Sequence, residues 1–251
     1  KGYPVKLTYS SSTLKKNFTF SYLNTVKNSA TLTFVAHPTL LSDLLAATTK
    51  MFRQPGGCFE QVSSSNYPNL VALKFLELSG YDQGNIKQTV LGYLQSGYSQ
   101  LAKYETSLGG FEWFGHTPPH EGLTAYGLMQ LTEMKAYIDV DEELLSRTKK
   151  WLMSRSNGNG GFNLDPGKYD QFKGAPEKIS NAYITWALSE IGEPNLDAYI
   201  KHVQKDLETF DAYRAALLVN TLINVGRIWD AELVLNGLLE HFKKGDYQTI
   251  T

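Results

Sequence analysis

The feature that most constrains the fold of this chain is an internal repeat. Stretches with aromatic and small residues at helical spacing recur, each after a turn, over residues 67–80, 123–131, 181–192 and 211–222. A supersecondary unit that recurs along a chain buries its apolar face against its neighbours in the array. The repeat therefore predicts a stack of helical hairpins.

Two of the turns between these helices carry the same text, Gly109-Gly110-Phe111 and Gly160-Gly161-Phe162. The glycines permit a tight turn, and we expect the aromatic ring to plug it. Between the two turns, residues 141–154 show helical periodicity, with an apolar stripe formed by Leu144, Leu145, Thr148, Trp151 and Leu152. This stripe predicts a second, outer layer of helices.

The N-terminal part of the chain has a different pattern. Short runs rich in β-forming residues cover residues 5–9, 18–23 and 30–35 and predict strands. After residue 37 the apolar residues recur at helical spacing, so we expect only helices from there to the C-terminus. Because three strands make a poor domain by themselves, we expect residues 1–37 to belong to a flanking β domain.

Composition excludes several classes of partner. The chain of 251 residues carries 24 basic and 25 acidic residues, which gives no electrostatic case for binding nucleic acid or an anionic membrane. No apolar stretch approaches the roughly 18 residues of a membrane-spanning helix, and the N-terminal residues do not read as a signal peptide.

A lone cysteine excludes an intrachain disulfide and a cysteine-rich zinc site. We expect no metal or cofactor.

The lone cysteine, Cys58, lies in the stretch Pro55-Gly56-Gly57-Cys58-Phe59-Glu60-Gln61. The Pro-Gly-Gly break predicts a helix that starts near Cys58. Residues three apart share a helix face, so the Cys58 thiol should lie beside the Gln61 carboxamide. Unpaired N–H groups at a helix N-terminus favour negative charge there. Attack of the thiolate on the side-chain amide, with loss of ammonia, would give an internal thioester.

This stretch resembles the Gly-Cys-Gly-Glu-Gln signature of the thioester domains of alpha-2-macroglobulins and complement proteins. It departs at Phe59, where animal members usually have glycine and bacterial macroglobulin-like proteins tolerate other residues, which favours a bacterial or otherwise macroglobulin-like member. The hairpins with Gly-Gly-Phe turns resemble the α/α toroid, a ring of inner helices wrapped by outer ones. The resemblance implies a mainly α toroid over residues 38–251, after a β segment, residues 1–37, from a CUB-like domain.

The resemblance also implies a function. Cys58 would supply the thiol and Gln61 the acyl carbon of a thioester that acylates lysines of a trapped protease, and Glu60 would support the helix N-terminus. Each chain reacts once, so the resemblance implies a protease inhibitor and not an enzyme. The expected partners are target proteases and flanking macroglobulin and CUB-like domains of the same parent chain. The expected location is extracellular, periplasmic or in the cell envelope.

Complement-type members carry a histidine after the second Gly-Gly-Phe turn that attacks the thioester and passes the acyl group to hydroxyls. Alignment of the flanking segments places Asp170 at that position, and a shift of one or two residues would place Lys168, Tyr169 or Gln171 there. Because an aspartate forms no acyl-imidazole intermediate, the resemblance implies direct transfer with a preference for amines.

Alternatives from other classes remain open. One is a complement-like opsonin that couples to surfaces through hydroxyls, and another is a toroidal binding module without a live thioester. Among toroid enzymes, a zinc-dependent prenyltransferase is disfavoured because Cys58 lies outside any ligand cluster, and a terpene cyclase because the chain has no Asp-Asp pair. A glycosidase would need paired carboxylates, for which the candidates are Glu112, Glu121, Asp165 and Asp170.

A cysteine hydrolase would need Cys58 together with a histidine base. The candidates are His37, His116, His120, His202 and His241, and no motif places any of them beside the thiol. His116 and His120 flank Pro118-Pro119, which prevents a helix, so their spacing does not imply a shared metal. We interpret them as solvated loop residues. Tyr67, Trp113 and Tyr169 are interpreted as core or rim aromatics.

Overall fold

The computed structural model describes residues 26, 29, 31, 52–80, 84–165, 175–205, 207 and 211–243. The chain divides into two compact units, Lys1–Leu44 and Leu45–Thr251. In the first unit the described residues show one turn, in which the Ser29 N–H and hydroxyl donate to the Val26 carbonyl at 3.1 and 2.7 Å. The predicted strands and the boundary after residue 37 fall almost entirely outside the described residues and stay predictions.

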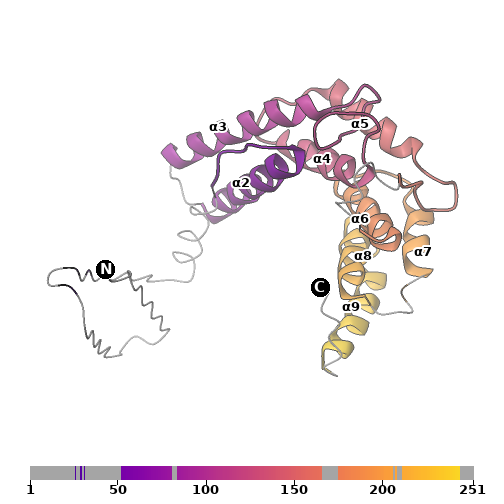
Figure 1. Ribbon diagram of the computed structural model, residues 1–251. Helices are drawn as coiled ribbons and strands as arrows, with labels where there is room; N and C mark the ends of the chain where they lie inside the picture. Colours follow the sequence, from indigo (N-terminus) through magenta and orange to yellow (C-terminus); the bar gives the residue numbers. More distant parts are fainter. Residues whose placement is uncertain are drawn as a thin grey trace, which may run out of the picture. The chain divides into compact units, whose positions relative to one another are not determined.

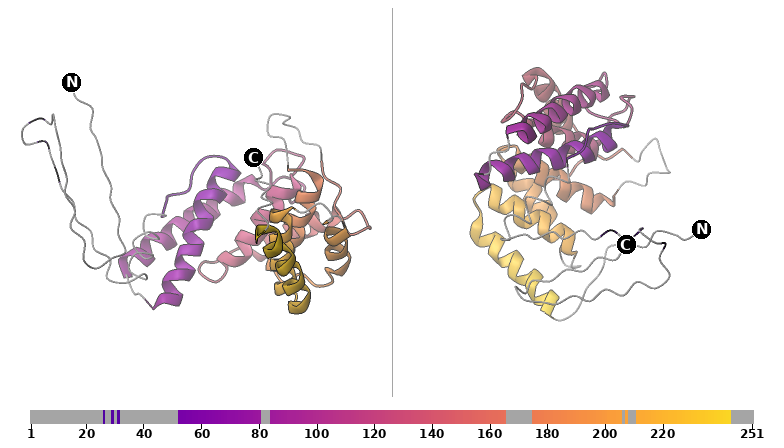
Figure 2. Two further views of the ribbon diagram at one scale, coloured as in Figure 1. Left: turned by 90° about the horizontal axis from the view of Figure 1, so that it is seen from below. Right: turned by 90° about the vertical axis from the view of Figure 1, so that its left-hand side faces the viewer.

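The second unit is built of helices in consecutive pairs. The first helices of these pairs are α2, α4, α6 and α8, and they pack in that order, α2 on α4, α4 on α6 and α6 on α8. Each of these four helices also packs against the second helix of its own pair. Figures 1 and 2 follow these pairs from α2 and α3 to α8 and α9. The bounds are α2 Phe59–Ser79, α3 Gly84–Leu101, η1 Ala102–Tyr104, α4 Glu121–Met134, α5 Glu142–Ser154, α6 Glu177–Glu190, α7 Asp197–Lys205, α8 Ala212–Asn224 and α9 Ile228–Lys243.

This order of inner and outer helices confirms the prediction of a mainly α fold of the α/α toroid type. The repeated sequence segments coincide with the inner helices α2, α4, α6 and α8. In the described ranges the β structure consists of isolated bridges, and none of these ranges contains a strand longer than a single bridge. Within them, no helix is both long and apolar enough to cross a lipid bilayer.

The two Gly-Gly-Phe turns adopt the same structure. Each closes an antiparallel bridge, Glu105 to Phe111 in the first and Ser156 to Phe162 in the second. In the first turn Thr106 donates to the Gly110 carbonyl at 2.8 Å, and in the second Asn157 donates to Gly161 at 2.9 Å. Both phenylalanines are buried, as predicted. In each turn the phenylalanine N–H donates to a side chain of the following inner helix, to Thr124 of α4 at 2.9 Å and to Asn181 of α6 at 3.0 Å.

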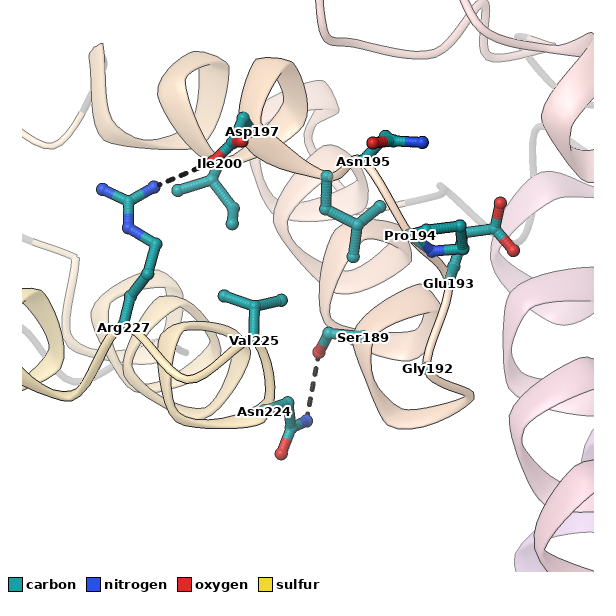
Figure 3. Close-up of a pocket in the computed structure, with 11 residues that line it drawn as sticks. Ser189, Gly192, Glu193, Pro194, Asn195, Asp197, Ile200, Asn224, Val225 and Arg227 are labelled. Atoms are coloured by element: carbon teal, nitrogen blue, oxygen red, sulfur yellow. Dashed lines mark hydrogen bonds and ion pairs between the residues drawn. The ribbon is translucent and has the colours of Figure 1, made fainter.

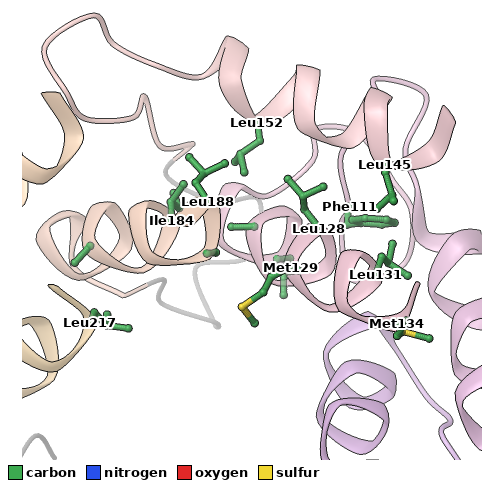
Figure 4. Close-up of a cluster of buried hydrophobic side chains, with 14 of the residues drawn as sticks. Phe111, Leu128, Met129, Leu131, Met134, Leu145, Leu152, Ile184, Leu188 and Leu217 are labelled. Atoms are coloured by element: carbon green, nitrogen blue, oxygen red, sulfur yellow. The ribbon is translucent and has the colours of Figure 1, made fainter. Parts of the chain in front are cut away.

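The core lies between the inner and outer helices. Figure 4 shows Leu128 of α4 on the side of that helix that faces Leu145 and Leu152 of α5, and Met129 on the other side, within one cluster of buried side chains. The predicted stripe of α5 is confirmed, because Leu144, Leu145, Thr148 and Leu152 are buried and Trp151 is half-buried. Burial of these apolar groups provides the main driving force for the assembly.

Truncation of a core leucine on an inner helix should destabilise the fold strongly. Leu131→Ala removes a fully buried side chain, and we expect a loss of about 2–5 kcal/mol in the free energy of unfolding, measured by urea denaturation. Leu78→Ala is the matched control, because the Leu78 side chain is 88% exposed. Its effect should stay within about 0.5 kcal/mol. Equal losses in the two variants would contradict this placement of the core.

Candidate functional site

Cys58 and Gln61 cap the start of helix α2 reciprocally. Cys58 is the N-cap, with φ −74° and ψ 174°, and its side chain forms a capping box with that of Gln61. The Gln61 Oε1 atom in turn accepts from the Cys58 backbone N–H at 3.1 Å. The helix therefore starts where the sequence predicted, and the structure brings the two side chains into one turn, half-buried at Cys58 and exposed at Gln61.

Gly57 makes room for this arrangement. Its φ of +106° lies in a region that favours glycine, and a Cβ atom there would lie 2.1 Å from Gln61 Oε1. Two residues from α3 and η1 hold the segment that leads into α2. Gln100 Nε2 donates to the Pro55 carbonyl at 3.0 Å, and the Tyr104 hydroxyl donates to the Gly57 carbonyl. The second glycine of the motif, Gly57, is thus favoured both by its φ and by the position of the Gln61 carboxamide.

Phe59 anchors the first turn of α2 in the core. Its ring is fully buried, stacks on Phe111 with centroids 4.9 Å apart, and meets Tyr104 edge-on at 6.3 Å. A Cβ atom at Gly127 would lie 2.8 Å from both Phe59 and Phe111. Sequence reasoning treated Phe59 only as a departure from glycine and missed this role. The signal was present in Gly127, a glycine in the middle of an otherwise apolar helix segment.

Trp113 contacts the same turn from the loop before α4. Its carbonyl accepts from the Phe59 N–H at 3.0 Å, and its indole Nε1 donates to Glu60 Oε2 at 3.0 Å. Trp113 is half-buried, in line with its interpretation as a rim aromatic. Glu60 is exposed and lies in the first turn, where a carboxylate is favourable.

His120 is not the solvated loop residue that the sequence suggested. It is half-buried, N-caps α4 by accepting from the Leu123 N–H through Nδ1 at 3.2 Å, and packs on Trp113 with ring centroids 4.9 Å apart. The prediction failed because the path of this irregular loop, which brings the two rings together, does not follow from sequence spacing. Burial lowers the pKa of His120, and the negative charges of Glu121, Asp165 and Glu112 oppose that shift only in part. His116 is exposed, as predicted.

The buried carboxylates of this region have structural partners. Glu112 Oε2 accepts from the N–H groups of Phe114 and His116 at 2.8 and 3.0 Å. Glu121 is 2% exposed and pairs with the Arg155 guanidinium at 2.8 Å. Both carboxylates therefore already serve structural contacts within the protein. Among the described residues, no group of histidine, cysteine and acidic side chains could hold a metal ion.

Other predicted residues lie elsewhere or outside the described residues. Tyr67 donates to Glu133 at 3.2 Å and meets Tyr126 edge-on at 5.7 Å, as expected of a rim aromatic. Burial, reinforced by the Glu133 charge, raises the pKa of Tyr67, and the same causes raise the pKa of Tyr126 to about 12. Asp170, its register alternatives Lys168, Tyr169 and Gln171, and His37 lie outside the described residues.

An open pocket of about 500 Å³ lies at the turns that follow α6 and α8. Figure 3 shows Arg227 paired with Asp197, and Asn224 bonded to Ser189, on its walls. None of the residues predicted from the sequence to be functional lines this pocket. The arrangement at Cys58 is therefore the better candidate site.

Comparison with known proteins identifies the family and the fold. Residues 34–223 match the family model described as the A-macroglobulin TED domain. Ovostatin from Gallus gallus is 26% identical over 235 residues, which cover 89% of this chain and 16% of that protein.

Two solved structures share the fold. Salmonella alpha-2-macroglobulin reacted with methylamine matches with a TM-score of 0.58 at 20% identity, over 78% of this chain and 13% of that one. The native conformation of E. coli alpha-2-macroglobulin matches with a TM-score of 0.56 at 19% identity, over 78% and 12%. This chain therefore spans only a small part of the length of these relatives.

A side chain at position 57 should disrupt the reciprocal cap. Gly57→Ala introduces a Cβ against Gln61 Oε1 and an unfavourable positive φ, so we expect a loss of about 1–3 kcal/mol in the free energy of unfolding. Gly56→Ala is the matched control, because a Cβ there meets nothing within 4 Å. Urea denaturation of both variants measures the difference. Equal stability of the two would contradict the assigned role of Gly57.

Acid should destabilise the protein partly through His120. Because its pKa in the folded state lies below the unfolded value of 6.5, the unfolded state binds the proton first, and stability falls as the pH drops below about 6.5. His120→Asn keeps a capping acceptor without a titrating ring. We expect its free energy of unfolding to fall less between about pH 7 and about pH 5 than that of wild type. The matched control, the exposed His116→Asn, should behave as wild type; an unchanged profile in His120→Asn would overturn this assignment.

Proposed function

Because the chain belongs to the A-macroglobulin thioester-domain family, we propose that Cys58 and Gln61 condense to an internal thioester that acylates amines of a trapped protease. The observation that carries this proposal is the reciprocal cap, a capping box in which the Cys58 backbone N–H donates to Gln61 Oε1 and the Cys58 side chain faces the same turn. In that arrangement the nucleophile and the acyl group belong to one rigid turn. Such proximity replaces a bimolecular encounter with an intramolecular step.

Thioester formation needs few further groups. The Cys58 sulfur attacks the Gln61 side-chain carbonyl carbon, the C–N bond breaks, and the amide nitrogen leaves as ammonia with the thiol proton. The Cys58 backbone N–H already donates to Gln61 Oε1 at 3.1 Å. It therefore polarises the carbonyl and stabilises the oxyanion of the tetrahedral intermediate. The N-terminus of α2 adds a favourable field for that negative charge.

In thioester formation the Cys58 sulfur is the nucleophile, and in acyl transfer it is the leaving group. The nitrogen of a lysine or small amine attacks the same carbon, the C–S bond breaks, and the proton lost by the amine ends on the Cys58 sulfur. The products are an amide at Gln61 and a free thiol. Because nothing regenerates the thioester, each chain reacts once, as a covalent inhibitor and not as a turnover enzyme.

The proposed acceptor preference follows from the residue that the alignment places at the position of the family's histidine. With Asp170 at the position of the histidine of complement-type members, no acyl-imidazole would form, and amines, the stronger nucleophiles, would react directly. Among the described histidines, His120 is occupied by its contacts with Leu123 and Trp113. The solved structure of a Salmonella relative is of a protein reacted with methylamine, an amine of this class.

The proposed activity belongs to a longer protein. The chain covers 16% of ovostatin and 13% of the Salmonella protein, which leaves room for flanking macroglobulin and CUB-like domains. Gln61 is exposed in this chain, and a thioester hydrolyses in water, so we expect another domain of the parent chain to cover the bond until a protease triggers exposure. The proposed location is extracellular, periplasmic or in the cell envelope.

The test is the intact mass and free-thiol content of the full-length protein before and after treatment with methylamine. We expect the untreated protein to lack one ammonia and the Cys58 thiol, and to gain one methylamine and one thiol on treatment. Cys58→Ala is the control and should have the full mass and take up no amine. A wild-type protein with full mass, a free Cys58 thiol and no uptake would contradict the proposal.

A further inference from the structure

Trp113 hydrogen-bonds to both residues that separate Cys58 from Gln61. Its main-chain carbonyl accepts from the Phe59 N–H at 3.0 Å, and its indole N–H donates to the Glu60 carboxylate at 3.0 Å. Phe59 and Glu60 are the first two residues of α2. One residue from a distant loop therefore contacts the Phe59 backbone and the Glu60 side chain, the two residues that the Cys58–Gln61 bond would span.

The loop that carries Trp113 is itself fixed from several sides. The preceding bridge pairs Glu105 with Phe111, and the Glu112 carboxylate, 3% exposed, accepts from two N–H groups further along the loop. On the other side, the Trp113 ring packs on His120, whose imidazole caps α4. The indole is thus positioned by contacts that do not depend on α2, so it can act as an external support for the first turn.

We propose that Trp113, through Glu60, is a positioning residue that sets the reactivity of the Cys58–Gln61 thioester. This inference rests on the proposed function, because it concerns the same bond. Cleavage and formation of that bond both depend on the Cys58 N–H staying on Gln61 Oε1. Holding Phe59 and Glu60 restricts the rotations that would separate these two atoms, and small losses of alignment reduce such reactions strongly.

Of the two contacts that Trp113 makes with α2, substitution of its side chain can remove only the one with Glu60. The contact to Phe59 uses a backbone carbonyl, which every residue at position 113 retains, whereas the contact to Glu60 needs the indole N–H. Trp113→Phe keeps a smaller aromatic ring at this position and removes the indole donor. Glu60→Gln keeps an acceptor oxygen for the indole, and Glu60→Leu does not.

The experiment measures the second-order rate constant for release of the Cys58 thiol by methylamine in the full-length protein. We expect Trp113→Phe and Glu60→Leu each to slow release by about three- to tenfold, with Glu60→Gln close to wild type. The double variant Trp113→Phe/Glu60→Leu should be no slower than either single variant, because both remove the same contact. Trp229→Phe, at a residue 73% exposed on α9, is the matched control and should react like wild type.

The outcomes separate this inference from the function on which it rests. A Trp113→Phe protein that reacts at the wild-type rate, a Glu60→Gln variant as slow as Glu60→Leu, or additive effects in the double variant would overturn the positioning role while the thioester stands. A Trp113 or Glu60 variant that has wild-type stability in urea but never loses ammonia would support the positioning role, because formation of the thioester needs the same alignment as its cleavage. If wild-type protein keeps its ammonia and its thiol, the proposed function fails and this inference fails with it.

Discussion

The capping contacts between Cys58 and Gln61, among them the hydrogen bond from the Cys58 N–H to Gln61 Oε1, are the constraint on which the rest of the site depends. They fix where α2 begins, and they place a thiol and a carboxamide in one turn at the end of a helix dipole. Gly57 is required because any side chain there would meet Gln61 Oε1. The surrounding residues can be understood as supports for this single turn.

The repeated scaffold supplies those supports. Each Gly-Gly-Phe turn buries a phenylalanine and leads into an inner helix, and the first copy also carries the loop with Trp113 and His120. Phe111 of that turn stacks on Phe59, so the same ring plugs the turn and anchors the start of α2. The Gly-Gly-Phe turn thus has a structural role in both copies, and the first copy is also part of the candidate site.

Sequence periodicity predicted the helices, their repeat and the start of α2, because these depend on local spacing and on glycine and proline breaks. It did not predict the parts of the site that come from distant segments. Glu60 and Trp113 are far apart in the sequence, and their contact exists only once α2 and α4 pack together. The sequence also predicted a solvated His120, because its contact with Trp113 depends on the path of the loop that both residues share and not on regular local spacing.

The central claim, that Cys58 and Gln61 are the two ends of one thioester, is tested most directly by locating the labelled atom. Full-length protein treated with deuterated methylamine would be digested, and its peptides sequenced by tandem mass spectrometry. The claim predicts label on the side chain of Gln61 alone, in a peptide whose Cys58 can now be alkylated. Label at another glutamine, or a Cys58 that is equally open to alkylation before treatment, would contradict it.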